Sequence, residues 1–261
     1  MTSTAPPDSS PERPDIERSE RYLTLVEHLQ ELRRRLIICS VAVVIGLAIS
    51  ATFTDDLLRF MKEPAEERSP DFVLVFLEPF ESFVTYFKIA LMGSLVIAMP
   101  VIVYQILAFV APGLNPNEKR WLYGTVIGAT GLFLVGVAFA YYIALPPALG
   151  FLLNFNDDIA EPQIRLGSYF DFVIRLLFWT GVSFETPLVV MFLARFRLVT
   201  ARKLIGWWRL AIVGAFVIAA VVTPTPDPVT CTIVAVPLIG LYFLGIILAF
   251  IVQPREPATA D

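Results

Sequence analysis

Long uncharged, apolar runs alternate with short charged segments along most of this 261-residue chain. Six of the runs predict membrane-spanning helices, because roughly 20 apolar residues at about 1.5 Å per residue cross the hydrocarbon core of a bilayer. The predicted spans are residues 36–53, 89–110, 121–144, 176–194, 207–222 and 229–251. The pattern therefore indicates an all-α membrane protein with six transmembrane helices.

Prolines refine these predicted spans. Pro100 lies inside the second span, where we expect a kink, and Pro146-Pro147 follows the third, where we expect the helix to end. The fifth span, residues 207–222, covers only about 24 Å, which is less than the usual hydrocarbon thickness. We therefore expect the bilayer to become thinner beside it.

The segment before the first span is amphipathic. Apolar residues recur at three- or four-residue spacing from Tyr22 to Leu36, whereas Glu27, Glu31 and Arg34 lie on the other face. This spacing predicts an N-terminal amphipathic helix that lies on the membrane surface and continues into the first span.

The positions of lysine and arginine set the expected orientation. Fourteen of the 20 cationic side chains fall in segments that share one side of the membrane, and the positive-inside rule places that side in the cytoplasm. We therefore expect a multi-pass protein of the cell inner membrane with both termini cytoplasmic. The outer segment of residues 54–88 includes an apolar run at Phe72–Leu77, and we expect it to form short helices and extended pieces.

The chain is expected to divide into three parts. Residues 1–19 are polar and rich in proline, which is typical of a disordered tail. Residues 20–252 would form a single six-helix membrane domain, and residues 253–261 a cytoplasmic tail.

Composition agrees with a membrane protein and argues against enzyme chemistry. Hydrophobic residues make up 56% of the chain and charged residues 17%, against roughly 45–50% and 25% in soluble domains. Cys39 and Cys231 are expected toward opposite membrane faces, so we expect no disulfide. His28 has no second metal ligand near it, and the phosphate-binding loop, the metalloprotease helix and the nucleophile elbow are all missing. We expect no metal, no cofactor, no nucleic-acid partner and no enzymatic activity.

Glu185 is the one acidic residue inside a predicted span. A carboxylate near the middle of a bilayer is costly, so it is by default a functional site. Two interpretations remain open. Glu185 is either an intramembrane polar site that receives water or a partner helix, or a structural glutamate that is protonated or hydrogen-bonded.

Two further carboxylates, Glu31 and Glu118, are expected on the inner face, one on the amphipathic helix and one in the first inner loop. Each could bind one arginine of a ligand through paired, charge-assisted hydrogen bonds. Each could equally pair with a local cation, Arg33 or Lys119, and would then contribute little. The sequence leaves these two alternatives balanced.

The turn between the fifth and sixth spans is rich in proline and carries Thr223 and Asp227. Asp227 could cap the sixth helix, which is the simpler interpretation, or take part in binding a partner.

Several motifs occur in an order that is typical of one family. They are His28-Leu-Gln-Glu-Leu-Arg33, Pro64, Glu78-Pro-Phe80, Pro100-Val-Ile-Val-Tyr-Gln105, Ala108-Phe-Val-Ala-Pro-Gly-Leu114, Glu118-Lys-Arg120, Ser168-Tyr-Phe170, Gly181-Val-Ser-Phe-Glu185-Thr-Pro187 and Thr223 to Asp227. In these motifs, over about residues 22–250, the chain resembles TatC, the six-span core subunit of the twin-arginine protein translocase.

This resemblance implies a function and a set of site residues. Folded cargo proteins with twin-arginine signal peptides would bind on the cytoplasmic face, and transport would use the proton-motive force. The carboxylates of Glu31 and Glu118 would bind the arginine pair, with Phe109 and Arg33 nearby. Glu185 would be the buried glutamate that faces a concave membrane pocket.

The resemblance also implies partners. Single-span subunits like TatA and TatB would pack beside the fifth and sixth spans, and several copies of the chain would assemble in one complex. Thr223, Asp227, Cys231 and the outer-face Pro64 would bind these partners or support the outer face. Cys231 and Phe243 depart from the family pattern, which has a glutamine and an acidic residue there, so we expect a less polar partner contact.

A proton-coupled carrier of small solutes that uses Glu185 is the alternative function. The two functions make different predictions for Glu118, which a signal-peptide receptor needs and a carrier does not. The lack of internal repeats argues against the carrier.

Overall fold

A computed structural model of the chain describes residues 13–68, 72–110, 116–154, 164–195, 199–223 and 228–252. Its helices are α1 (Arg13–Ala51), α2 (Thr54–Glu66), α3 (Glu81–Val110), α4 (Pro116–Phe139), the π-helical turn η1 (Ala140–Ala144), α5 (Leu145–Asn154), α6 (Leu166–Phe184), α7 (Thr186–Arg195), α8 (Ala201–Gly206), α9 (Trp208–Val222) and α10 (Pro228–Val252). Two short strands, β1 (Leu74–Val75) and β2 (Ile164–Arg165), pair in parallel.

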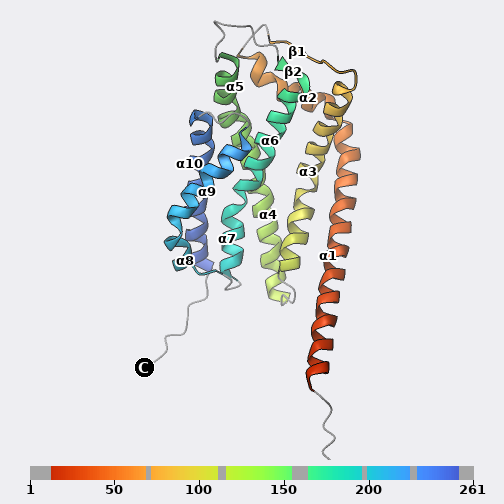
Figure 1. The fold of residues 1–261 in the computed structure, drawn as a ribbon, viewed down its shortest axis with the longest axis vertical. Coiled ribbons are helices and arrows are strands. Elements are labelled where there is room, and N and C mark those ends of the chain that lie inside the picture. Colours follow the sequence, from red (N-terminus) through yellow and green to blue (C-terminus); the bar gives the residue numbers. More distant parts are fainter. Residues whose placement is uncertain are drawn as a thin grey trace, which may run out of the picture.

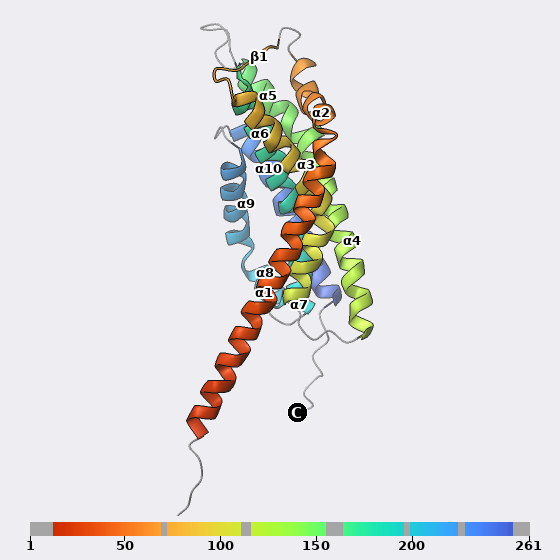
Figure 2. The same cartoon turned by 90° about the vertical axis from the view of Figure 1, so that its right-hand side faces the viewer.

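The long helices form one elongated bundle with two different ends (Figure 1). We call the end that carries α2, β1 and β2 the cap end. We call the opposite end, where α3 passes to α4 and α10 finishes, the tail end. Viewed from the side, α1 extends beyond the rest of the bundle at the tail end (Figure 2).

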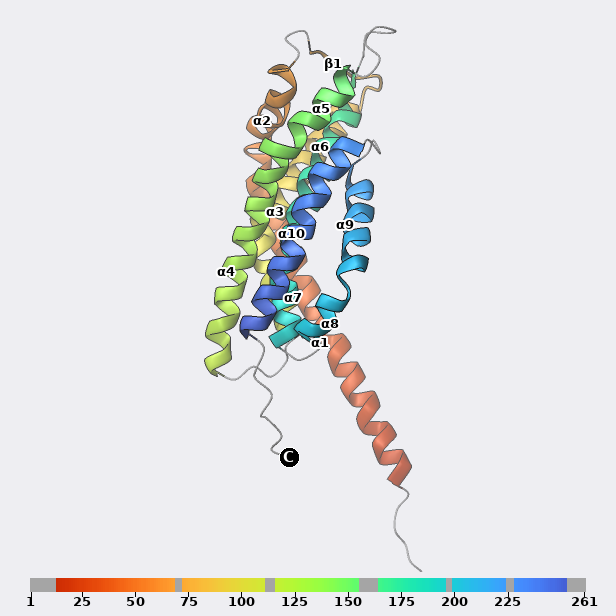
Figure 3. The same ribbon diagram turned by 90° about the vertical axis from the view of Figure 1, so that its left-hand side faces the viewer.

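The prediction of an all-α membrane fold is confirmed. Within the described residues, five helical segments are long and apolar enough to cross a membrane: Val26–Ala51, Glu81–Phe109, Leu122–Leu152, Leu166–Arg195 and Pro228–Val252. The fifth predicted span, residues 207–222, corresponds to a shorter apolar helix, Trp208–Val222, which stands at one edge of the bundle beside α10 (Figure 3).

The N-terminal helix differs from the prediction in two ways. It begins at Arg13, inside the stretch expected to be disordered; Pro14 is compatible with this start because the first turn of a helix has no intrahelical partner for its N–H groups. The amphipathic segment also continues straight into the span and does not turn onto a surface (Figure 2), since no proline or glycine interrupts residues 15–45. Residues 1–12 and 253–261 lie outside the described part of the chain.

The third membrane segment does not end at Pro146-Pro147, contrary to the prediction. The chain passes from α4 through η1 into α5, which runs to Asn154. The Leu145 N–H bonds to the Ala140 carbonyl, five residues back, so the helix widens by one residue just before the prolines. A wide turn accommodates residues that lack an N–H, and the two prolines therefore lie in the first turn of α5 without stopping the helix.

Small residues bring the helices together in the membrane region. A Cβ atom on Gly46 of α1 would lie 2.8 Å from the Ser94 carbonyl oxygen of α3, and the Ser94 hydroxyl donates to the Val43 carbonyl at 2.9 Å. Between α4 and α6, a Cβ on Gly136 would lie 2.9 Å from the Gly181 Cα atom. Such close backbone contacts replace the hydrophobic effect, which cannot hold helices together in lipid.

The cap end is organised by one buried carboxylate, Glu81, which is only 6% exposed. Its Oε1 accepts hydrogen bonds from Arg165 Nε at 2.8 Å and from the Gly167 N–H at 2.7 Å, and its Oε2 accepts from the Leu77 N–H at 3.1 Å. The hydrogen bond from Arg165 to Glu81, with a further one to Glu78, raises the pKa of the Arg165 guanidinium. Glu81 thereby connects the start of α3 to β2 and the start of α6.

Two tyrosines fix α2 across the cap end. The Tyr141 hydroxyl donates to the Phe60 carbonyl and the Tyr169 hydroxyl to the Met61 carbonyl, each at 2.7 Å. Pro64 is buried in the same helix. The short helix and the extended pieces that we expected in residues 54–88 are present where the structure describes this segment.

Candidate functional site

The first candidate site lies at the tail end, on the seam between α1 and α3. Arg35 Nε donates to Glu31 Oε1 at 3.0 Å, and Arg35 Nη1 donates to Gln105 Oε1 at 3.2 Å. The Glu31 side chain remains 33% exposed, because this pair uses only its Oε1 atom. Glu31 is therefore held in position by Arg35, and its second carboxylate oxygen has no hydrogen-bond partner among the described residues.

An aromatic contact extends this seam by one more turn toward the tail end. The rings of His28 and Phe109 stack with their centroids 4.5 Å apart and an angle of 24° between the planes. His28 and Glu31 are three residues apart, so they lie on the same face of α1. The side chains of Phe109 and Glu31 thus come from two helices to one surface.

The other two predicted residues of this site stand apart from the contacts. Arg33 is exposed on α1 and makes no ion pair with any described residue. Glu118 belongs to the first turn of α4, but its side chain lies outside the described part of the structure. Its predicted role therefore stays a prediction.

Sequence reasoning missed Arg35, His28 and Gln105 as members of this site. It considered Arg33 as the local partner of Glu31, whereas the structure pairs Glu31 with Arg35. The four-residue spacing from Glu31 to Arg35 was the available signal, because an acid followed four residues later by a base lies on one helix face. Nothing in the sequence pairs Arg35 with Gln105, which is 70 residues away.

Glu185 marks a break in the fourth membrane segment. It lies between α6 and α7, and its N–H bonds to the Val182 carbonyl three residues back, with a geometry tighter than that of an α-helix. Pro187 follows in the first turn of α7. The Glu185 Oε1 atom is buried and has no hydrogen-bond partner within the described residues.

A buried carboxylate oxygen without a partner is unfavourable, and a proton, a water molecule or a partner group would relieve the cost. The surroundings of Glu185 do not satisfy it by hydrogen bonds. A structural glutamate whose Oε1 is hydrogen-bonded by its own chain is therefore not what the described residues show. A protonated structural glutamate and a polar site inside the membrane both stay predictions.

The second candidate surface is the pair of helices α9 and α10. Thr223, at the end of α9, donates to the Ala219 carbonyl at 2.8 Å, and its Oγ1 lies 3.3 Å from Cys231 Sγ on α10. Phe243 is exposed on α10. Asp227 lies outside the described residues, so neither of its predicted roles is tested.

No group of three or more histidine, cysteine, aspartate or glutamate side chains among the described residues is arranged to hold a metal ion. The two cysteines, Cys39 and Cys231, are free thiols, in agreement with the expected lack of a disulfide.

The sequence and the fold match one family of membrane proteins. The family model described as "Sec-independent protein translocase protein (TatC)" matches residues 27–237. The TatC protein of Deinococcus radiodurans is 36% identical over 264 residues, which cover 98% of this chain and 96% of that protein. The chain belongs to the TatC family.

Further relatives agree with membership of the TatC family. The chloroplastic TATC protein of Arabidopsis thaliana is 38% identical over 251 residues, which cover 92% of this chain and 73% of that protein. A crystal structure described as the twin-arginine translocase receptor TatC matches with a TM-score of 0.76 and 36% identity, over 86% of this chain and 99% of that one. The resemblance inferred from the motifs is confirmed, and the alternative of a solute carrier is not supported.

Proposed function

We propose that this protein is the core subunit of a twin-arginine translocase and binds twin-arginine signal peptides at the tail end of its bundle. The observation that carries the proposal is the seam between α1 and α3, where Arg35, itself hydrogen-bonded to Gln105, holds Glu31 in place through one carboxylate oxygen and leaves the other oxygen without a partner among the described residues. A preorganised carboxylate binds a guanidinium at low entropic cost.

Arginine geometry explains why such a site would select a twin-arginine motif. A guanidinium offers several N–H donors in a plane, whereas an ammonium group is a point charge. One arginine of the ligand would donate to the free oxygen of Glu31, and the second would bind Glu118 in the adjoining first turn of α4. The stacked rings of His28 and Phe109 would provide an apolar surface beside the arginine pair.

The orientation follows from the same proposal. Signal peptides reach the protein from the cytoplasm, so the tail end would face the cytoplasm of the cell inner membrane, with both termini on that side. The cap end would then face outward. This orientation agrees with the distribution of lysine and arginine along the chain.

Single-span subunits like TatA and TatB would bind along α9 and α10, and several copies of the chain would share one complex. Large apolar side chains such as Val217, Val221, Phe243 and Ile247 are exposed on these two helices. At the junction of the two helices the Thr223 hydroxyl and the Cys231 thiol contact each other, which supports a less polar partner contact at these two residues. Transport would use the proton-motive force, with no enzymatic step by this chain.

The decisive experiment measures binding of a labelled twin-arginine peptide to the purified protein in nanodiscs. We expect Glu31→Gln to weaken binding by about tenfold, since a charge-assisted hydrogen bond contributes about 1.5–3 kcal/mol. Glu118→Gln should weaken binding to a similar degree.

A twin-lysine peptide and a Glu27→Gln variant are the matched controls. The twin-lysine peptide keeps the charge and loses the planar donors, so it should bind more weakly to the wild type. Glu27 is an exposed glutamate on the same helix, without an ion pair among the described residues, and its replacement should change little. Equal binding of both peptides, or equal losses in the Glu27 and Glu31 variants, would contradict the proposed receptor site.

A further inference from the structure

A groove near the cap end, between α3 and α6, is not part of either candidate site. It has a volume of about 360 Å³ and is lined by one face of each helix. On α6, Asp171, Arg175 and Trp179 follow one another at four-residue spacing, and Lys88 and Leu95 are seven residues apart on α3. The groove lies between two segments that are long and apolar enough to cross a membrane, Glu81–Phe109 and Leu166–Arg195.

The upper part of this groove is charged and carries an excess of positive charge. Lys88 Nζ donates to both oxygens of Asp171, at 2.7 and 2.8 Å, and so joins α3 to α6. Arg175 lies one turn farther along α6 and is exposed, without an ion pair or hydrogen bond to any described residue. The upper part of the groove therefore holds two cations, Lys88 and Arg175, and one carboxylate, Asp171.

The lower part of the groove is apolar. Leu95 of α3 and Phe178 of α6 line it, and Trp179, which is 48% exposed, stands at its edge. A soluble anion would use only the upper part of such a groove.

Arg175 lies below the headgroup zone, at a depth from which a long side chain extends toward it. The membrane segment begins at Leu166, so at about 1.5 Å per residue Arg175 lies roughly 14 Å along it. The headgroup zone on each side of a bilayer takes up about 5–7 Å. By this count the Arg175 backbone lies roughly 7–9 Å inside the hydrocarbon, and an arginine at such a depth extends its guanidinium toward the phosphates.

We propose that this groove binds one anionic phospholipid from the leaflet at the cap end. Arg175 and Lys88 bind the phosphate diester, Asp171 keeps Lys88 in place, and an acyl chain lies along Leu95 and Phe178 beside Trp179. The bound lipid supplies the anion that Arg175 lacks within the described residues.

The test uses the full-length protein in phosphatidylcholine nanodiscs, into which phosphatidylglycerol is titrated. Native mass spectrometry counts the phosphatidylglycerol molecules retained on each protein. We expect one to be retained preferentially by the wild type. Arg175→Gln should weaken its retention by about tenfold, which corresponds to one charge-assisted contact. Arg175→Lys keeps the charge and should retain the lipid better than Arg175→Gln.

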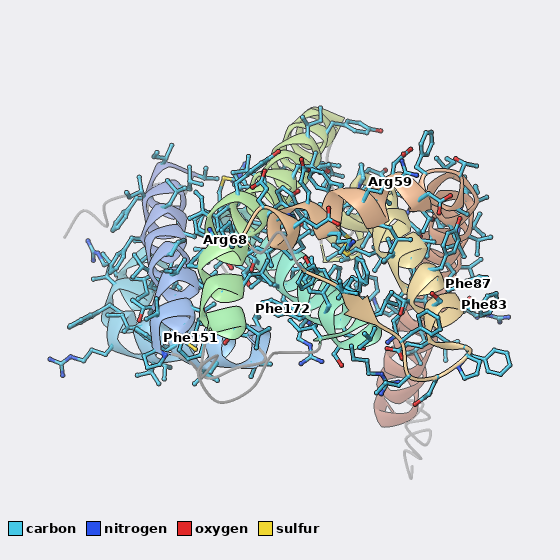
Figure 4. All side chains as sticks on the ribbon, turned by 90° about the horizontal axis from the view of Figure 1, so that it is seen from above. Arg59, Arg68, Phe83, Phe87, Phe151 and Phe172 are labelled. Carbon is cyan, nitrogen blue, oxygen red and sulfur yellow. The ribbon has the colours of Figure 1, made fainter. Side chains whose placement is uncertain are left out.

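Arg59→Gln is the matched control, because Arg59 is an exposed cation of the same end that lies on α2 and outside the groove (Figure 4). It should bind phosphatidylglycerol like the wild type. Equal losses in the Arg59 and Arg175 variants would reduce the effect to general surface charge and overturn the proposal. Displacement of the lipid by millimolar inorganic phosphate would overturn it in favour of a soluble anion. A wild type that shows no preference for phosphatidylglycerol would also overturn it, and would leave a partner helix as the candidate for the groove.

Discussion

At the scale of single residues, two carboxylates that pair with the same arginine differ in how deeply they are buried. Arg165 donates to Glu81 and to Glu78, but the side chain of Glu81 is 4% exposed whereas that of Glu78 is 69% exposed. Glu81 also accepts two backbone N–H groups, which would lose a charged acceptor if the carboxylate were removed. Loss of the buried Glu81 carboxylate should therefore destabilise the fold more than loss of the exposed Glu78 carboxylate, although both pair with Arg165.

We expect Glu81→Gln to lower the midpoint of thermal unfolding by several degrees, because a neutral amide cannot accept all three hydrogen bonds of a buried carboxylate. Glu78→Gln removes a solvent-screened pair with the same arginine and should leave the midpoint nearly unchanged. Thermal unfolding of both purified variants in one detergent makes the comparison. Equal shifts for the two would show that burial of Glu81 does not matter.

Arg35 gives a second prediction at the residue scale. We expect Arg35→Gln to reduce the discrimination between twin-arginine and twin-lysine peptides several-fold, because Glu31 would lose the partner that orients its carboxylate. The overall affinity for the peptides should persist, because Arg35 is itself a cation that competes with the peptide for the Glu31 carboxylate. Peptide titrations in nanodiscs measure both quantities, with the exposed Arg34→Gln on the same helix as a control. Unchanged discrimination would mean that Arg35 does not position Glu31.

At the scale of helices, the hydrophobic pattern predicted which segments form apolar helices and failed at some of their ends. The hydrophobic pattern identifies segments that are apolar on all sides, and each of the six predicted spans lies in helical structure. It does not detect a wide turn such as η1, which depends on backbone hydrogen bonds and carries the helix past Pro146-Pro147. It also does not detect contacts between distant residues, so the Arg35–Gln105 bond at the candidate site was not foreseen.

The space around each glycine shows which helix contacts are tight. A Cβ atom on Gly46 would lie 2.8 Å from a backbone oxygen of α3, whereas one on Gly131 of α4 would meet nothing within 4 Å. We expect Gly46→Ala to destabilise the protein by about 1–3 kcal/mol, as overpacked sites do. Gly131→Ala should be neutral or stabilising, by up to about 1 kcal/mol, because alanine favours a helix over glycine. Unfolding of the two variants under matched detergent conditions tests this, and a destabilised Gly131→Ala with an unaffected Gly46→Ala would reverse it.

At the scale of the whole molecule, the helices are arranged as a row with two distant edges. Helix α1 packs against α3 at one edge, and α10 packs against α7 and α9 at the other, with α4 and α6 between them. Seen from the cap end, α1 and α10 lie at opposite sides of the bundle (Figure 4). A change confined to one edge should therefore leave the packing at the other edge unaltered.

Two glycines at opposite edges test this independence. A Cβ atom on Gly245 of α10 would lie 3.1 Å from the Pro187 Cα and 3.1 Å from the Val190 Cβ of α7, so Gly245→Ala should destabilise the α7–α10 contact. Combined with Gly46→Ala, its effect should add within about 0.5 kcal/mol, because the two sites are distant and share no packing partners. A double-mutant cycle on unfolding free energies measures the coupling. The matched comparison combines Gly46→Ala with Ser94→Ala, which share the α1–α3 contact and should couple by about 0.5 kcal/mol or more. Strong coupling between Gly46 and Gly245 would instead mean that the row of helices transmits strain from one edge to the other, as a single rigid unit would.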